Sequence, residues 1–131
     1  MDKKLRDQLS KIKLLICDID GVLTDGSFIK STSGDELRSF NALDGVGFVT
    51  LRLLNLNIKT AWITGRESLT TTQRAEELQI DDVYNGVIRK IDAYDELKKK
   101  YGVLDNEVCF IGDDIIDCLL YTSPSPRDSC A

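Results

Sequence analysis

Histidine is missing from this chain of 131 residues. Its absence excludes a histidine-dependent catalytic triad, a histidine general base and any histidine-ligated metal site. The sequence also lacks an apolar run close to the roughly 20 residues that span a membrane, and its N-terminus lacks the apolar core of a signal peptide. The net charge is −5, and no basic cluster occurs beyond residues 98–100, so the composition argues against a nucleic-acid partner. Any chemistry must therefore rest on carboxylates, lysine and threonine.

Cysteine occurs four times, but without the spacing of a metal site. Cys17 and Cys109 fall in predicted strands, where a free thiol behaves as a small hydrophobic group. This usage suits a reducing compartment, so we expect a cytoplasmic protein without membrane association. The length fits a single domain with a real core.

Helical and strand-like patterns alternate along the chain. The apolar spacing predicts helices over residues 4–12, 45–56, 67–79 and 91–101, and strands over 13–17, 59–63, 82–84 and 107–111. Residues 27–41 indicate a β-hairpin with a polar tip at 31–35. Strands that alternate with helices predict an α/β domain built on a parallel sheet with right-handed crossovers.

Polar side chains follow three of the four predicted core strands, and one lysine begins a helix. These residues are Asp18 and Asp20, then Thr64, Gly65 and Arg66, then Asp113, Asp114 and Asp117, with Lys90 at the helix start. Each feature alone has an ordinary interpretation as a turn, a helix cap or a surface lysine. Because carboxyl ends of parallel strands meet at one edge of the sheet, their coincidence predicts one functional site there.

Two carboxylates at the end of a buried strand need a compensating cation, and a divalent metal is the simplest candidate. Magnesium held by Asp18 and Asp113 would turn an acidic rim into a site for a phosphate dianion, and Lys90 would add a second positive charge. The Thr64 hydroxyl and the Gly65 amide could hold phosphate oxygens. One carboxylate could then attack phosphorus while the other transfers protons.

The order of these motifs resembles the haloacid dehalogenase superfamily of phosphatases. Within it, five segments are similar to the 3-deoxy-D-manno-octulosonate 8-phosphate (KDO 8-phosphate) phosphatase family: residues 18–26, 40–41, 44–47, 63–66 and 112–117. The resemblance covers roughly residues 10–118. It implies a Rossmann-like three-layer fold without a large cap, from which the hairpin at about 27–41 protrudes.

The resemblance assigns a role to each candidate residue. Asp18 would be the nucleophile, Asp20 the acid and base, Thr64 the phosphate binder and Lys90 the charge stabiliser. Magnesium would be held by the Asp18 carboxylate, the Asp20 backbone carbonyl and Asp113, with Asp114 and Asp117 supporting these ligands.

The resemblance also implies the substrate and the assembly. The substrate would be a phosphorylated sugar acid, with KDO 8-phosphate the first choice, a nine-carbon sialic-type acid 9-phosphate the alternative, and a role in lipopolysaccharide biosynthesis. The protein would be a homotetramer whose hairpins join the subunits. Arg66 and Arg74 would meet the substrate carboxylate, Arg74 from the adjacent subunit.

Two other functions deserve comparison. A phosphorelay receiver domain also uses an aspartate pair, a threonine and a lysine, but there the lysine comes last, whereas here residues 112–114 follow Lys90. A non-catalytic assembly module is disfavoured because all four signatures are retained. In the family, a helix and a fifth strand follow residue 117, whereas residues 119–131 are rich in serine and proline. We therefore expect a phosphatase domain over 1–118, incomplete at its C-terminus, and a non-native or disordered tail over 119–131.

Overall fold

The computed structural model describes residues 2–112 and confirms the predicted alternation of strands and helices. The helices are α1 (Lys3–Ser10), α2 (Ala42–Leu53), α3 (Leu69–Leu78) and α4 (Lys90–Tyr101), with a 3-10 turn η1 (Asp105–Glu107). The strands are β1 (Leu14–Asp18), β2 (Ile29–Lys30), β3 (Glu36–Leu37), β4 (Lys59–Ile63), β5 (Asp82–Tyr84) and β6 (Val108–Ile111).

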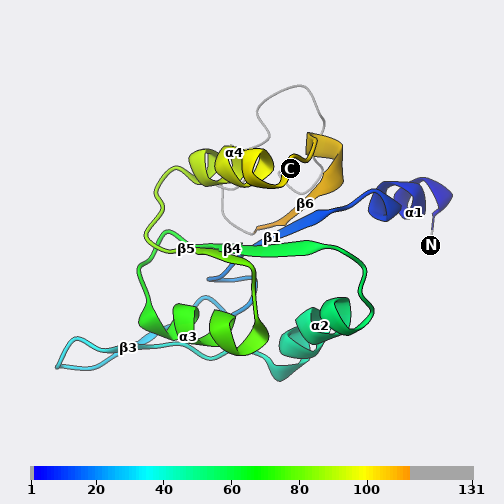
Figure 1. Ribbon diagram of the computed structural model, residues 1–131. Coiled ribbons are helices and arrows are strands. Elements are labelled where there is room, and N and C mark those ends of the chain that lie inside the picture. Colours follow the sequence, from blue (N-terminus) through cyan, green and yellow to red (C-terminus); the bar gives the residue numbers. More distant parts are fainter. Residues whose placement is uncertain (1, 113–131) are drawn as a thin grey trace.

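Four parallel strands form the central sheet in the order β5-β4-β1-β6. Helix α4 covers one face, and α2 and α3 cover the other, so the domain has the three predicted layers (Figure 1). Asp18 is the register partner of Ile63 on β4, and Ile63 is the partner of Tyr84 on β5. The carboxyl ends of these strands therefore lie together, and the residues after them share one rim of the sheet.

The core divides between the two faces because side chains alternate along a strand. On the α4 face, Leu14 and Ile16 of β1 pack with Leu97, and all three are fully buried. On the opposite face, Cys17 and Trp62 pack against side chains of α2 and α3. Because β1 and β4 are packed on both faces, the residues that follow them are held in place at the rim.

Local signals explain where the helices begin and end. The Asn41 side chain accepts a hydrogen bond from the amide of Leu43 and caps α2, so this helix runs three residues earlier than the predicted 45–56. The Ser68 hydroxyl caps α3 by accepting from the amide of Thr71. Helix α4 ends at Tyr101, and the next residue, Gly102, has a left-handed φ of 62°, which confirms the predicted stop.

The hairpin is shorter than the expected 27–41. Its two strands pair Ile29 with Leu37 and Lys30 with Glu36, and they form a separate antiparallel sheet beyond α3 (Figure 1). Phe40 does not belong to it, because its ring stacks on Trp62 in the core with centroids 6.1 Å apart. Phe40 thus anchors the chain to the domain before α2 begins, which the sequence did not predict.

No helix within residues 2–112 has the length and apolar character needed to cross a membrane. The predicted tail over 119–131 and the predicted site residues Asp113, Asp114 and Asp117 lie outside the described residues.

Candidate active site

Asp18 and Lys90 form a buried ion pair at the rim. Asp18 is the last residue of β1, and Lys90 is the first residue of α4. The Lys90 ammonium donates to Asp18 Oδ1 over 3.0 Å, and only 6% and 7% of the Asp18 and Lys90 side chains are exposed. A lysine is seldom buried without a partner. The end of β1 and the start of α4 lie close enough to provide one here. It brings together two residues that lie 72 positions apart.

Asp20 is held through both of its carboxylate oxygens. Arg38 Nε donates to Oδ1 over 2.9 Å, and the Thr64 hydroxyl donates to Oδ2 over 3.4 Å. The Asp20 side chain is 25% exposed, whereas Thr64 is almost fully buried at the end of β4. The Asp20 carboxylate is therefore partly exposed at the rim, and hydrogen bonds from Arg38 and Thr64 fix its orientation.

Two protein cations contact these carboxylates, Lys90 at Asp18 and Arg38 at Asp20. Lys90 was expected as a positive charge at this site, whereas Arg38 was not. The expected divalent metal would be a further cation at the rim, and the case for it depends on the donor chemistry and on relatives.

The segment after β4 bends and lies against the residues that follow β5. The Thr64 amide donates to the carbonyl of Tyr84, and the Thr64 carbonyl accepts from the amide of Val87. A Cβ atom at Gly65 would lie 3.4 Å from the Val87 carbonyl oxygen, which is an ordinary van der Waals contact, so the available space does not require glycine here. The Thr64 hydroxyl also accepts from the amide of Arg66 over 3.2 Å. The predicted phosphate-binding segment is therefore held in place by backbone hydrogen bonds to Tyr84 and Val87 and by the Thr64 side chain.

The two arginines predicted to meet a substrate carboxylate have protein partners in this chain. Arg66 donates to Glu36 Oε1 over 2.9 Å, and its guanidinium lies over the Phe28 ring, 4.0 Å from the centroid. Arg74 pairs with Glu77 one turn along α3. Its guanidinium also lies within 2.7 Å of the point where a Cβ at Gly45 would stand, so it packs against α2. Within residues 2–112, Arg74 makes no hydrogen bond or ion pair with Asp18 or Asp20 of its own chain.

The rim offers hard oxygen donors of the kind that magnesium prefers. Of the predicted ligands, the Asp18 carboxylate and the Asp20 carbonyl fall within the described residues, and Asp113 does not. Across residues 2–112, no three acidic or cysteine side chains come together as a metal cluster. The donor chemistry fits a divalent cation, but the set would be completed only by residues beyond 112.

Sequence reasoning missed two residues of this site, Arg38 and Ser68. The Arg38 side chain is fully buried, and its Nη1 donates to Ser68 Oγ over 2.9 Å. The available signal was a lone arginine where the hairpin returns to the domain, but its partner lies 18 residues earlier. A pattern in the sequence does not reveal such a contact unless the path of the hairpin is known.

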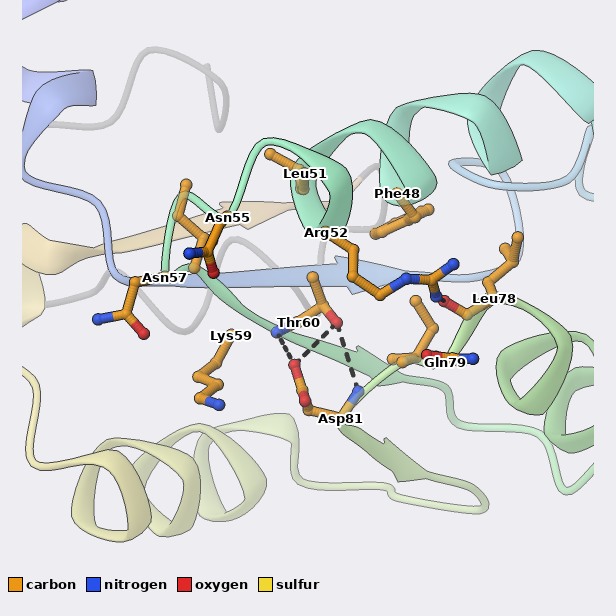
Figure 2. A pocket seen from close by; sticks show the side chains of 12 residues that line it. Phe48, Leu51, Arg52, Asn55, Asn57, Lys59, Thr60, Leu78, Gln79 and Asp81 are labelled. Atoms are coloured by element: carbon orange, nitrogen blue, oxygen red, sulfur yellow. Dashed lines mark hydrogen bonds between the residues drawn. The ribbon is translucent and has the colours of Figure 1, made fainter.

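Two cavities lie beside the sheet. One, of about 440 Å³, is lined by residues 22–25 and 39–41 together with Asp44. The other, of about 190 Å³, lies near the start of β4, where Thr60 and Asp81 share hydrogen bonds and Arg52 donates to the carbonyl of Leu78 (Figure 2). Since Lys59 begins β4 and Thr64 follows its end, the second cavity is remote from the paired aspartates. The larger cavity is lined by residues that follow Asp20 in the chain, but not by Asp18, Asp20, Thr64 or Lys90.

Known proteins are similar to this chain in fold and in sequence, although no protein-family model matches it. A 3-deoxy-D-manno-octulosonate 8-phosphate phosphatase of Yersinia pestis is 41% identical over 108 residues, which make up 82% of this chain and 57% of the relative. The crystal structure of the corresponding Moraxella catarrhalis phosphatase, in complex with magnesium, phosphate and KDO, matches with a TM-score of 0.83 and 35% identity, over 89% of this chain and 66% of that one. The cobalt-bound Haemophilus influenzae phosphatase matches with a TM-score of 0.77 and 35% identity, over 84% and 63%.

The parallel sheet, the aspartates at its carboxyl edge and these likenesses show that the chain belongs to the haloacid dehalogenase superfamily. Within that superfamily it belongs to the 3-deoxy-D-manno-octulosonate 8-phosphate phosphatase family. The chain spans a little over half the length of the curated relatives it matches.

Proposed function

We propose that this domain is a metal-dependent phosphatase that hydrolyses KDO 8-phosphate to KDO and inorganic phosphate. The observation that carries the proposal is the pairing of Asp18 with Lys90 beside an Asp20 held by Thr64. The relatives named for this activity, one of them bound to magnesium, phosphate and KDO, support the substrate and the metal. A cytoplasmic location remains the expectation from the sequence.

Asp18 is the proposed nucleophile. Its carboxylate attacks phosphorus and forms an aspartyl phosphate while the bond from phosphorus to the sugar oxygen breaks. The departing sugar oxygen takes its proton from Asp20, which then removes a proton from the water that attacks the aspartyl phosphate. This second step releases inorganic phosphate and restores the Asp18 carboxylate. Both aspartates thus return to their starting protonation states.

The surrounding side chains hold charge where the reaction needs it. Lys90, 3.0 Å from Asp18 Oδ1, steadies the nucleophile and attracts the phosphate dianion. Thr64 and the Gly65 amide are the proposed donors to phosphate oxygens. Magnesium, when bound by Asp18, the Asp20 carbonyl and Asp113, would neutralise the negative charge that builds up on the phosphoryl group.

The neighbouring subunit is part of the proposal. We propose a homotetramer in which the hairpins meet, since Ile29 and Leu37 pair on this small sheet and are 67% and 57% exposed. Two strands alone are marginal in water, so a further apolar partner would stabilise them. Arg74 would then serve the site of the adjacent subunit.

Phosphate release tests the function directly. The full chain is assayed with KDO 8-phosphate and Mg²⁺, and a nine-carbon sugar acid 9-phosphate serves as the competing substrate. Asp18→Asn should abolish turnover because an amide is a poor nucleophile, while Asp7→Asn, on the exposed helix α1, is the matched control. Retention of more than a few per cent of activity by the Asp18 variant would refute the assignment, and faster release from the nine-carbon compound would change the substrate.

A further inference from the structure

Arg38 connects the hairpin to the catalytic rim, and neither the sequence motifs nor the proposed mechanism uses it. It follows β3 directly, and its side chain is fully buried. Its guanidinium donates to Asp20 Oδ1 and to Ser68 Oγ, each over 2.9 Å. The third nitrogen, Nη2, lies 3.4 Å from Glu36 Oε2 without the alignment of a hydrogen bond. A buried arginine with three polar neighbours is a costly feature unless its position matters.

The contact divides the two oxygens of Asp20 between two donors. Oδ1 accepts from Arg38, and a guanidinium does not lose its protons in proteins. Oδ1 must therefore remain an acceptor, so a proton carried by Asp20 belongs on Oδ2. Oδ2 faces the Thr64 hydroxyl, on the side of the proposed phosphate-binding segment. Unlike a guanidinium, a hydroxyl can rotate and accept a hydrogen bond, so the contact with Thr64 is compatible with a proton on Oδ2.

We propose that Arg38 is a positioning residue that makes Asp20 Oδ2 the oxygen that transfers the catalytic proton. The inference rests on the proposed function, because it assigns Arg38 a role in that same proton transfer. It also gives the hairpin a second role beyond assembly. Glu36 on β3 contacts both Arg38 and Arg66, so a displacement of the hairpin would be transmitted to the acid and base of the reaction.

The ordinary alternative is that Arg38 is a structural residue alone. It lies 5.9 Å from the Phe28 ring centroid and could simply hold the base of the hairpin. The two interpretations differ in one respect. A positioning role acts through Asp20, so it has no effect once Asp20 can no longer carry a proton, whereas a structural role persists.

A kinetic double-mutant cycle separates them. The kcat and KM for phosphate release from KDO 8-phosphate with Mg²⁺ are measured for wild type, Arg38→Met, Asp20→Asn and the double variant. We expect Arg38→Met to lower kcat by about 10²-fold, the scale of a small misplacement of a reacting group, with little change in KM. In the Asp20→Asn background the same substitution should cost almost nothing further.

Two further variants keep the test decisive. Arg38→Lys retains a cation and should recover part of the lost kcat, and it replaces Arg38→Met in the cycle if the methionine variant does not fold. Arg52→Met is the matched control, because Arg52 also makes an internal hydrogen bond, to the carbonyl of Leu78, but at the other end of β4. Its effect on kcat should be small and the same in both backgrounds.

The outcomes distinguish this inference from the function on which it rests. A wild type that releases no phosphate refutes the proposed function, and the role of Arg38 with it. An active wild type in which Arg38→Met lowers kcat equally with and without Asp20 refutes the positioning role alone. Loss of the Arg38 effect in the Asp20→Asn background, with partial recovery by lysine, supports it.

Discussion

Replacement of Lys90 by methionine tests whether the rim depends on its buried ion pair. Methionine keeps most of the length of lysine and removes the charge. The Lys90 ammonium lies 3.0 Å from Asp18 Oδ1, and the two side chains are 7% and 6% exposed. After the substitution, the Asp18 carboxylate stays at the end of a buried strand without this cation. Such a charge is poorly solvated, so the folded state should lose stability.

The structure sets the scale of that loss. Removal of one partner from a buried pair typically costs about 3–5 kcal/mol, whereas an exposed pair contributes at most about 1 kcal/mol. The adjacent pair Arg89–Asp92 supplies the comparison, since its atoms are 3.6 Å apart and its side chains are 74% and 66% exposed. We expect Lys90→Met to lower the free energy of unfolding by about 3–5 kcal/mol, and Arg89→Met to lower it by less than about 1 kcal/mol.

Urea unfolding at neutral pH in the absence of divalent metal measures both values. The double variant Asp18→Asn/Lys90→Met should be more stable than Lys90→Met alone, because it also removes the buried negative charge that Lys90 balances in the wild type. If Lys90→Met is no more destabilising than Arg89→Met, or if the double variant recovers nothing, the burial argument is wrong.

Three other predictions concern the hairpin and the core. The hydrogen bond from Arg66 holds the pKa of Glu36 below its ordinary value of 4.5. This contact therefore stabilises the hairpin above pH 4.5, and the stabilisation is lost as the pH falls through the lowered pKa of Glu36. Arg66→Ala should raise the pKa of Glu36 in a carboxyl NMR titration, and an unchanged titration would exclude the contact. Burial raises the pKa of the Cys17 thiol to about 12, so iodoacetamide at pH 8 should label Cys17 in urea but not in the folded chain, as read by peptide mass spectrometry. Aspartates placed at both Phe28 and Ile29 should dissociate the proposed tetramer and weaken substrate binding together, and a monomer in sedimentation that keeps wild-type catalytic efficiency would refute the shared site.

Patterns confined to one element were predictable from the sequence. The bounds of β4 and β5 agree with the prediction because apolar and β-branched runs end there in turn residues. The contacts of Lys90 with Asp18 and of Thr64 with Asp20 also followed from the rule that ligands gather at carboxyl ends of parallel strands. Both arguments use information that lies within a few residues or in the topology of the sheet.

Contacts between elements were not predictable in the same way. The hairpin was expected to extend to residue 41, but Phe40 turns back to stack on Trp62, which single-strand alternation does not reveal. Arg38 contacts Asp20 because the chain returns to the rim after the hairpin. The sequence does not reveal this path, so the charge argument named a metal as the cation beside the aspartates and did not include Arg38. Arg66 was assigned to a substrate although Glu36, thirty residues away, already binds it.

The position of Trp62 makes this chain its own optical reporter. It is the only tryptophan in the sequence, it is 1% exposed, and its indole lies against Phe40 and Phe48. Because Phe40 belongs to the segment that leaves the hairpin and Phe48 belongs to α2, a local release of that segment would alter the fluorescence before the sheet itself unfolds. An emission change that precedes the loss of circular dichroism would therefore identify opening next to the rim, without any label being introduced.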